Sequence, residues 1–109
     1  MIETIIDEYI VKIGENQKEN DLLVKKSDPN DYWLHISDYS SAHGVIQNPK
    51  NEIINNKIIK KVCMLIKMKS NKCKSIHNLK FSVTKIKNLT TTNVEGQVII
   101  NGDYKTISI

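Results

Sequence analysis

The segment from Asp31 to His43, DYWLHISDYSSAH, carries most of the side chains in this sequence that could do chemistry. It holds the only tryptophan, two of the three histidines and a pair of adjacent serines. Imidazole and carboxylate groups can bind a divalent metal ion, and a serine beside a histidine can act as a nucleophile. A turn of small residues with two hydroxyls can instead bind phosphate. The segment is therefore a candidate for catalysis, for ligand binding or for a structural turn.

A catalytic site in this segment would use His35 and His43, with Asp31 or Asp38 completing a metal site. The spacing matches no common metal-ligand pattern, and a loop separates the two histidines. Ser41 lies close to His43, but no GxSxG turn is present to expose a nucleophile. We therefore predict that the protein is not an enzyme and needs no metal or other cofactor. A small metal-dependent phosphoesterase or nuclease is the alternative, and each histidine can also serve only to hydrogen-bond a turn.

Binding of a phosphate-containing ligand would use the same residues without a reaction. Ser40 and Ser41 supply hydroxyl donors, and the small residues beside them expose backbone N–H groups to phosphate oxygens. Trp33 offers an aromatic face on which a nucleobase can stack. A lone tryptophan on a strand packs in the core more often than it binds a ligand, so both roles stay open for Trp33.

Charge is distributed unevenly along the 109 residues. Residues 1–52 carry five lysines and ten acidic residues, whereas residues 53–94 carry ten lysines and no acidic residue. This distribution predicts a positive surface that attracts a polyanion, although an ordinary solvated surface could have the same composition. Because the chain has no arginine, contacts to the phosphate backbone are favoured over bidentate contacts to bases. The candidate contacts are Lys57, Lys60, Lys61, Lys67, Lys85 and Lys87.

The remaining bulk properties describe one small domain over residues 1–109. The acidic N-terminus differs from a signal peptide, and no apolar run is long enough to cross a bilayer. We therefore expect a cytoplasmic protein without a membrane partner. Cys63 falls on an apolar helix face and is predicted to lie in the core, whereas Cys73 lies among lysines and is predicted to be an exposed thiol.

Two helices are predicted by their capping residues and their periodicity. Asn16, three residues before Glu19, resembles a capping box and opens a short helix. Asn55 caps a longer helix that runs to about Lys69, with a wide apolar stripe and most of its lysines on the opposite face.

Strands are predicted where apolar and polar residues alternate, at residues 9–13, 32–36 and 79–85, with a further strand near 44–47. In the second of these, Tyr32, Leu34 and Ile36 share one face, while Trp33 and His35 share the other. The C-terminal residues 96–109 are predicted to form a hairpin that turns at Asn101-Gly102. The pattern indicates an α+β fold with a mixed, mostly antiparallel sheet of five to six strands and two helices.

The motifs also have a recognisable order. GENQKENDLL is followed by DYWLH, by SSAH, by a helix that ends in KS, and then by VTKIKNL and EGQV. This order resembles the NFACT-R (NFACT RNA-binding) domain over nearly the whole chain, from Tyr9 to Ile109. The most specific part of the resemblance is Asp-x-Trp-x-His followed by Ser-Ser-x-His. Glu15 departs from the pattern, because many members of the family have a basic residue at this position.

The resemblance implies RNA binding, because in RqcH-type ribosome quality-control factors this domain helps to hold tRNA on the large ribosomal subunit. By match, the signature polar positions are Asn20, His35, Ser41 and His43. The sequence contains neither the N-terminal NFACT domain nor a coiled coil, which implies a stand-alone module that lacks the tailing reaction of those factors. We therefore predict a module that binds structured RNA such as tRNA or rRNA. DNA is an alternative ligand, and protein interaction is an alternative function.

Overall fold

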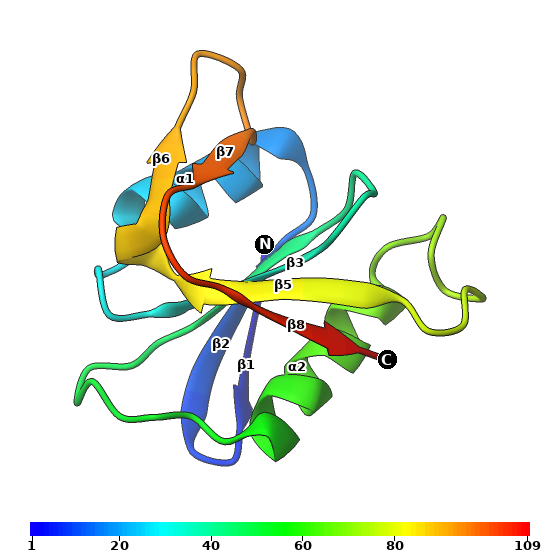
Figure 1. The fold of residues 1–109 in the computed structure, drawn as a ribbon, viewed down its shortest axis with the longest axis horizontal. Helices are drawn as coiled ribbons and strands as arrows, with labels where there is room; N and C mark the ends of the chain where they lie inside the picture. Colours follow the sequence, from blue (N-terminus) through cyan, green and yellow to red (C-terminus); the bar gives the residue numbers. More distant parts are fainter.

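The computed structural model describes residues 1–109, and its central element is a six-stranded antiparallel sheet in the order β1-β2-β4-β3-β5-β8 (Figure 1). These strands are β1 (Ile2–Ile6), β2 (Tyr9–Gly14), β3 (Tyr32–Ile36), β4 (His43–Ile46), β5 (Lys80–Lys85) and β8 (Lys105–Ser108). The two helices are α1 (Gln17–Lys26) and α2 (Asn56–Met68). A short 3-10 turn, η1 (Ile86–Asn88), leads to a separate pair of strands, β6 (Leu89–Thr91) and β7 (Val98–Ile100). The predicted α+β fold with two helices is confirmed.

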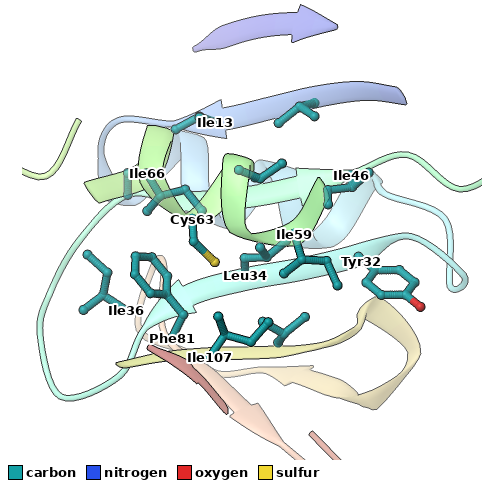
Figure 2. Close-up of a cluster of buried hydrophobic side chains, with 14 of the residues drawn as sticks. Ile13, Tyr32, Leu34, Ile36, Ile46, Ile59, Cys63, Ile66, Phe81 and Ile107 are labelled. Carbon is teal, nitrogen blue, oxygen red and sulfur yellow. The ribbon is translucent and has the colours of Figure 1, made fainter. Parts of the chain in front are cut away.

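Helix α2 covers one face of the sheet and makes the main core with it. Its apolar residues recur every three or four positions, so Ile59, Cys63 and Ile66 point at the strands (Figure 2). Alternate residues of β3 point back at the helix, as the sequence predicted, with Leu34 at the centre. Eighteen buried residues form this core, which supplies most of the apolar burial of the domain.

Helix α1 and the β6–β7 pair lie on the opposite face of the sheet (Figure 1). The core on this side is a cluster of only five buried residues, in which Trp33 packs with Leu23 and Val24 of α1, with Val45 and with Ile86. Val98 and Ile100 of β7 pack against the edge of the cluster. Apolar side chains therefore cover only part of this face of the sheet.

Both helix caps follow the sequence prediction. The side chain of Asn16 accepts a hydrogen bond from the Glu19 N–H at 2.9 Å, and the side chain of Asn55 accepts one from the Ile58 N–H at 3.0 Å. The second half of the predicted capping box is displaced by one residue, because the Glu19 carboxylate accepts from the N–H of Glu15. These polar contacts fix where each helix begins.

The predicted C-terminal hairpin is wrong, and β1 and β6 were not predicted. Strand β7 pairs with β6, and β8 pairs with β5 in the main sheet, so the arms that flank Asn101-Gly102 belong to different sheets. The N–H of Asn101 donates instead to the Asn88 carbonyl, at 2.7 Å. Burial explains the separation: Ile107 belongs to the α2 core, whereas Ile100 packs on the α1 side.

Two predictions of exposure are also wrong. Cys73 is completely buried in the α2 core, and its N–H donates to the Ser70 carbonyl in the turn that follows α2. Lys67, assigned to the exposed face of α2, is only 9 % exposed. Cys73 lies beyond the end of α2, where the helical periodicity read from the sequence no longer applies, and its side chain packs in the core. Cys63 lies in the core as predicted, and burial raises the pKa of its thiol to about 12.

Candidate nucleic-acid interface

The signature residues come together at one end of the two central strands, on the α1 face. Strands β3 and β4 pair so that His35 lies opposite His43. The two imidazole rings lie 4.6 Å apart in an edge-to-face arrangement, and the Trp33 ring stacks 5.6 Å from His35. The alternation predicted for β3 therefore places Trp33 and His35 on the same side, and sheet pairing adds His43 to them.

Trp33 and His43 are joined by a buried hydrogen bond. The indole Nε1–H donates to Nδ1 of His43 at 3.3 Å, which places the imidazole proton of the neutral ring on Nε2. Trp33 is 2 % exposed and His43 is 4 % exposed. Trp33 is thus mainly a core residue, and it presents little of its ring to a ligand.

Burial keeps both histidines neutral at physiological pH. It lowers the pKa of His35 to about 4. It also lowers the pKa of His43 to about 3, and the nearby charge of protonated His35 adds to this effect. The cluster therefore presents neutral aromatic rings and directed hydrogen-bonding groups, and it contributes no positive charge to the surface.

The SSAH loop is held by a side chain from α1 and by one from the turn after α2. The Asn20 side chain accepts from the His43 N–H at 3.1 Å and donates to the Ser41 carbonyl at 3.3 Å. Ser70, just after α2, accepts from the Ala42 N–H at 3.3 Å. Two backbone N–H groups that could have bound phosphate are therefore already paired within the protein.

A cavity of about 450 Å³ opens beside this cluster, between the sheet and the β6–β7 pair. It brings together most of the predicted polar site: Asn20, Trp33, His35, Ser40, Ser41 and His43. The β6–β7 connection adds Glu95 and Gln97, which belong to the EGQV motif but were not predicted as site residues. No lysine lines this cavity.

The predicted lysines do not join the signature residues. Lys57, Lys60 and Lys61 are exposed on α2, across the sheet from the cavity, and Lys61 forms an ion pair with Asp7 at 2.8 Å. Lys85 lies at the far end of β5, since it pairs with Tyr32 while Ser82 pairs with His35. That offset is about 10 Å along the strand.

The amino group of Lys85 also makes contacts within the protein. Its Nζ donates to Asn51 at 2.7 Å and lies 5.9 Å from the centre of the Tyr32 ring. Lys87, two residues further along, is exposed.

Two other lysines do lie near the signature loop, and the sequence analysis missed them. Lys69 and Lys72, at and after the end of α2, line a second cavity of about 330 Å³ with Ser40 and Ser41. The KS ending of the helix was the available signal, because Ser70 is the residue that ties this turn to the loop.

No cluster of three or more histidine, cysteine, aspartate or glutamate side chains is arranged to hold a metal ion. Neither helix is long and apolar enough to span a membrane.

An α+β domain with a lysine-rich second half and a neutral, polar aromatic cavity has the features of a nucleic-acid-binding module. The chain belongs to the NFACT protein RNA-binding domain family, whose model matches residues 3–107. It is therefore an RNA-binding domain, and the resemblance noted in the sequence is confirmed over almost the whole chain.

Similar proteins include coiled-coil domain-containing proteins. The chain is 38 % identical over 66 residues to the Coiled-coil domain-containing protein 25 homolog of Dictyostelium discoideum, covering 58 % of this chain and 32 % of that protein. It is 33 % identical over 88 residues to Coiled-coil domain-containing protein 25 of Mus musculus, covering 77 % of this chain and 42 % of the relative. The chain thus spans less than half the length of these relatives.

The fold also occurs in a solved bacterial structure. The C-terminal part of the fibronectin/fibrinogen-binding protein of Streptococcus suis superposes with a TM-score of 0.85 at 21 % identity. The match covers 98 % of this chain and 43 % of that one. At this identity the likeness supports the fold alone.

Proposed function

We propose that this domain binds structured RNA, tRNA or rRNA, in the cytoplasm, and that it does so on the large ribosomal subunit. The observation that carries the proposal is membership of the RNA-binding family in a chain whose residues 53–94 contain ten lysines and no acidic residue. Clustered positive charge attracts the phosphate backbone of any nucleic acid and supplies affinity that does not depend on sequence.

In this proposal, one set of residues provides affinity for RNA and another provides selectivity. Phosphates are neutralised over a broad surface by the accessible lysines among those predicted, which are Lys57, Lys60, Lys61, Lys85 and Lys87. Lys67 is buried and is not part of this surface. The signature residues Asn20, Trp33, His35, Ser40, Ser41 and His43 form or support the polar cavity that distinguishes one RNA feature from another. Contacts to phosphate position an RNA, and directed contacts to its bases and sugars select it.

The salt dependence of affinity tests the electrostatic part. If four to six lysines neutralise phosphates, the logarithm of the association constant should fall with the logarithm of salt concentration, with a slope of roughly −3 to −5. Fluorescence anisotropy with labelled tRNA, between low and physiological salt, measures this slope. A duplex DNA of matched length serves as the competitor, because DNA remains the alternative ligand. A slope near zero would contradict the proposal.

We also propose that the domain binds RNA without cutting it. Incubation of tRNA with the pure protein and Mg²⁺ or Mn²⁺ should leave the RNA intact, with or without a chelator. Degradation that stops with chelator and is abolished by His35→Ala would establish the nuclease alternative instead.

A further inference from the structure

The two cavities beside the SSAH loop adjoin each other, and together they are called the groove. Four residues, Gln17, Asn20, Ser40 and Ser41, line both the cavity of about 450 Å³ and the cavity of about 330 Å³. The shared wall is rigid at two points, because the side chain of Asn20 is hydrogen-bonded to residues on both sides of Ala42. A ligand lying across this wall would contact both cavities at once.

The larger cavity has the chemistry of a site for a flat, uncharged ring. Its floor is the neutral cluster of Trp33, His35 and His43, and its walls carry the hydroxyl of Ser82 and the amide of Gln97. The Trp33 N–H is already used by His43, but the ring of His35, the Nε2–H of His43 and the NH2 group of Gln97 can form hydrogen bonds along the edge of a nucleobase. The volume lies within the range of roughly 300–1,000 Å³ that holds small ligands. With Glu95 as its only charged residue, this cavity disfavours phosphate.

The smaller cavity has the opposite character. Lys69 and Lys72 line it, and the backbone N–H groups of Asn71 and Lys72 make no hydrogen bond within the protein. Consecutive free N–H groups beside lysines are donors that suit a phosphate group. Glu15 also lines this cavity, where its single negative charge is outnumbered by the two lysines.

We infer that the groove holds one unpaired nucleotide of the bound RNA, with its base in the larger cavity and an adjoining phosphate at Lys69 and Lys72. This inference rests on the proposed function and specifies the RNA feature that the signature site recognises. A base within a duplex is stacked and paired, so only a nucleotide in a loop, a bulge or a single-stranded end can enter. The acid at one end and the lysines at the other fix the direction in which the nucleotide lies.

Trp33, the only tryptophan, lies in the floor of the larger cavity and stacks on His35, so its emission should respond when a ligand fills the cavity. The experiment compares two RNAs with the same stem, one ending in a single-stranded extension of four nucleotides and one blunt. At a fixed salt concentration, the extended RNA should bind at least tenfold more tightly and should change Trp33 emission. The blunt duplex should bind weakly and leave the emission unchanged.

A pair of isosteric variants separates the groove from the rest of the surface. Gln17→Glu places a negative charge on the shared wall, at the first residue of α1, where the helix dipole favours an acid and the fold is preserved. This change should remove the preference for the extended RNA. Gln47→Glu makes the same change in charge outside the groove and should keep the preference. Replacing Lys69 and Lys72 with glutamine should also reduce the preference, while both RNAs still bind through the remaining lysines.

The outcomes distinguish the two proposals. Equal binding of both RNAs, with unchanged Trp33 emission, would overturn the nucleotide site and leave RNA binding in place. Failure of both RNAs to bind at low salt would overturn the proposed function as well. Loss of the preference in both Gln17→Glu and Gln47→Glu would overturn the assignment of the site to this groove.

Discussion

The two faces of the central sheet differ in what their side chains do. The face under α2 buries eighteen residues in one apolar core, with Phe81, Ile59 and Leu34 completely inaccessible to solvent. The face under α1 buries five, and beside them it leaves a cavity floored by aromatic and imidazole rings. One face stabilises the fold, and the stability it supplies allows the other face to stay open and polar. A domain of this size has little stability to spare, so it can keep an open polar site on one face only if the core on the other face supplies enough apolar burial.

The largest expected effect is on the α2 face. Phe81→Ala leaves a cavity in a close-packed core and should reduce the free energy of unfolding by about 3–5 kcal/mol. Leu23→Ala, on the α1 face, should cost about 2 kcal/mol, at the lower end of the range, because its cluster is small and borders an open cavity. Urea unfolding followed by circular dichroism measures both. An equal loss in the free energy of unfolding for the two variants would contradict the proposed difference between the two faces.

Acid should weaken the α1 face selectively. In the unfolded chain His43 has its ordinary pKa of 6.5, but in the fold its pKa is about 3, so protons bind preferentially to the unfolded state. The stability contributed by the neutral ring is complete above about pH 6.5 and declines as the pH falls toward 3. His43 alone should account for about 2 kcal/mol by about pH 5.

Urea unfolding at about pH 7.5 and about pH 5 tests this effect. His43→Gln should reduce the pH dependence because it removes the titrating ring. His77→Gln, at an exposed position, is the control for replacing a histidine outside the cluster. Equal stability of the wild-type protein at both pH values would contradict the lowering of the His43 pKa by burial.

A smaller effect is expected where α1 holds the SSAH loop. Asn20→Ala removes the two hydrogen bonds to residues 41 and 43 and should cost about 1–2 kcal/mol. Gly14→Ala should strain the same contact, since a Cβ there would lie 2.4 Å from the Asn20 side-chain oxygen. Thermal melting and hydrogen exchange of residues 40–44 measure both. Unchanged exchange in this loop would mean that Asn20 acts through the ligand and has no structural role.

The smallest effect on stability is expected at the exposed lysines. Replacing Lys57 and Lys60 with glutamate changes only solvent-facing side chains and should shift stability by less than about 0.5 kcal/mol. Affinity should fall by a similar factor for paired and unpaired RNAs, because lysine–phosphate contacts carry little sequence information. Competition between the two RNAs measures this factor. A loss confined to one RNA would place these lysines at the selective site.

The double variant Ser41→Ala, His43→Ala tests the signature loop itself. It removes no formal charge at neutral pH, so the salt slope should change little. Because His43 accepts the Trp33 bond and is buried, we expect lower stability together with a weaker preference among RNAs. A large fall in melting temperature with unchanged RNA preference would show that the loop is only structural.

The sequence determined the local structure and the family of this protein. Helix caps at Asn16 and Asn55 and the alternation of β3 were predictable, because hydrogen bonding and side-chain period act over a few residues. The motif order identified the NFACT RNA-binding family and placed His35 and His43 among its signature positions.

Only the tertiary structure decided which of these residues meet. It separated the two arms around Asn101-Gly102, buried Cys73, and brought Lys69 and Lys72 to the SSAH loop in place of the predicted lysines. It also paired the loop N–H groups of Ala42 and His43 with Ser70 and Asn20. Each outcome depends on contacts between segments far apart in the chain. The packing of Ile107 in one core and of the partly buried Ile100 against the other outweighed the local preference of a two-residue turn for a hairpin.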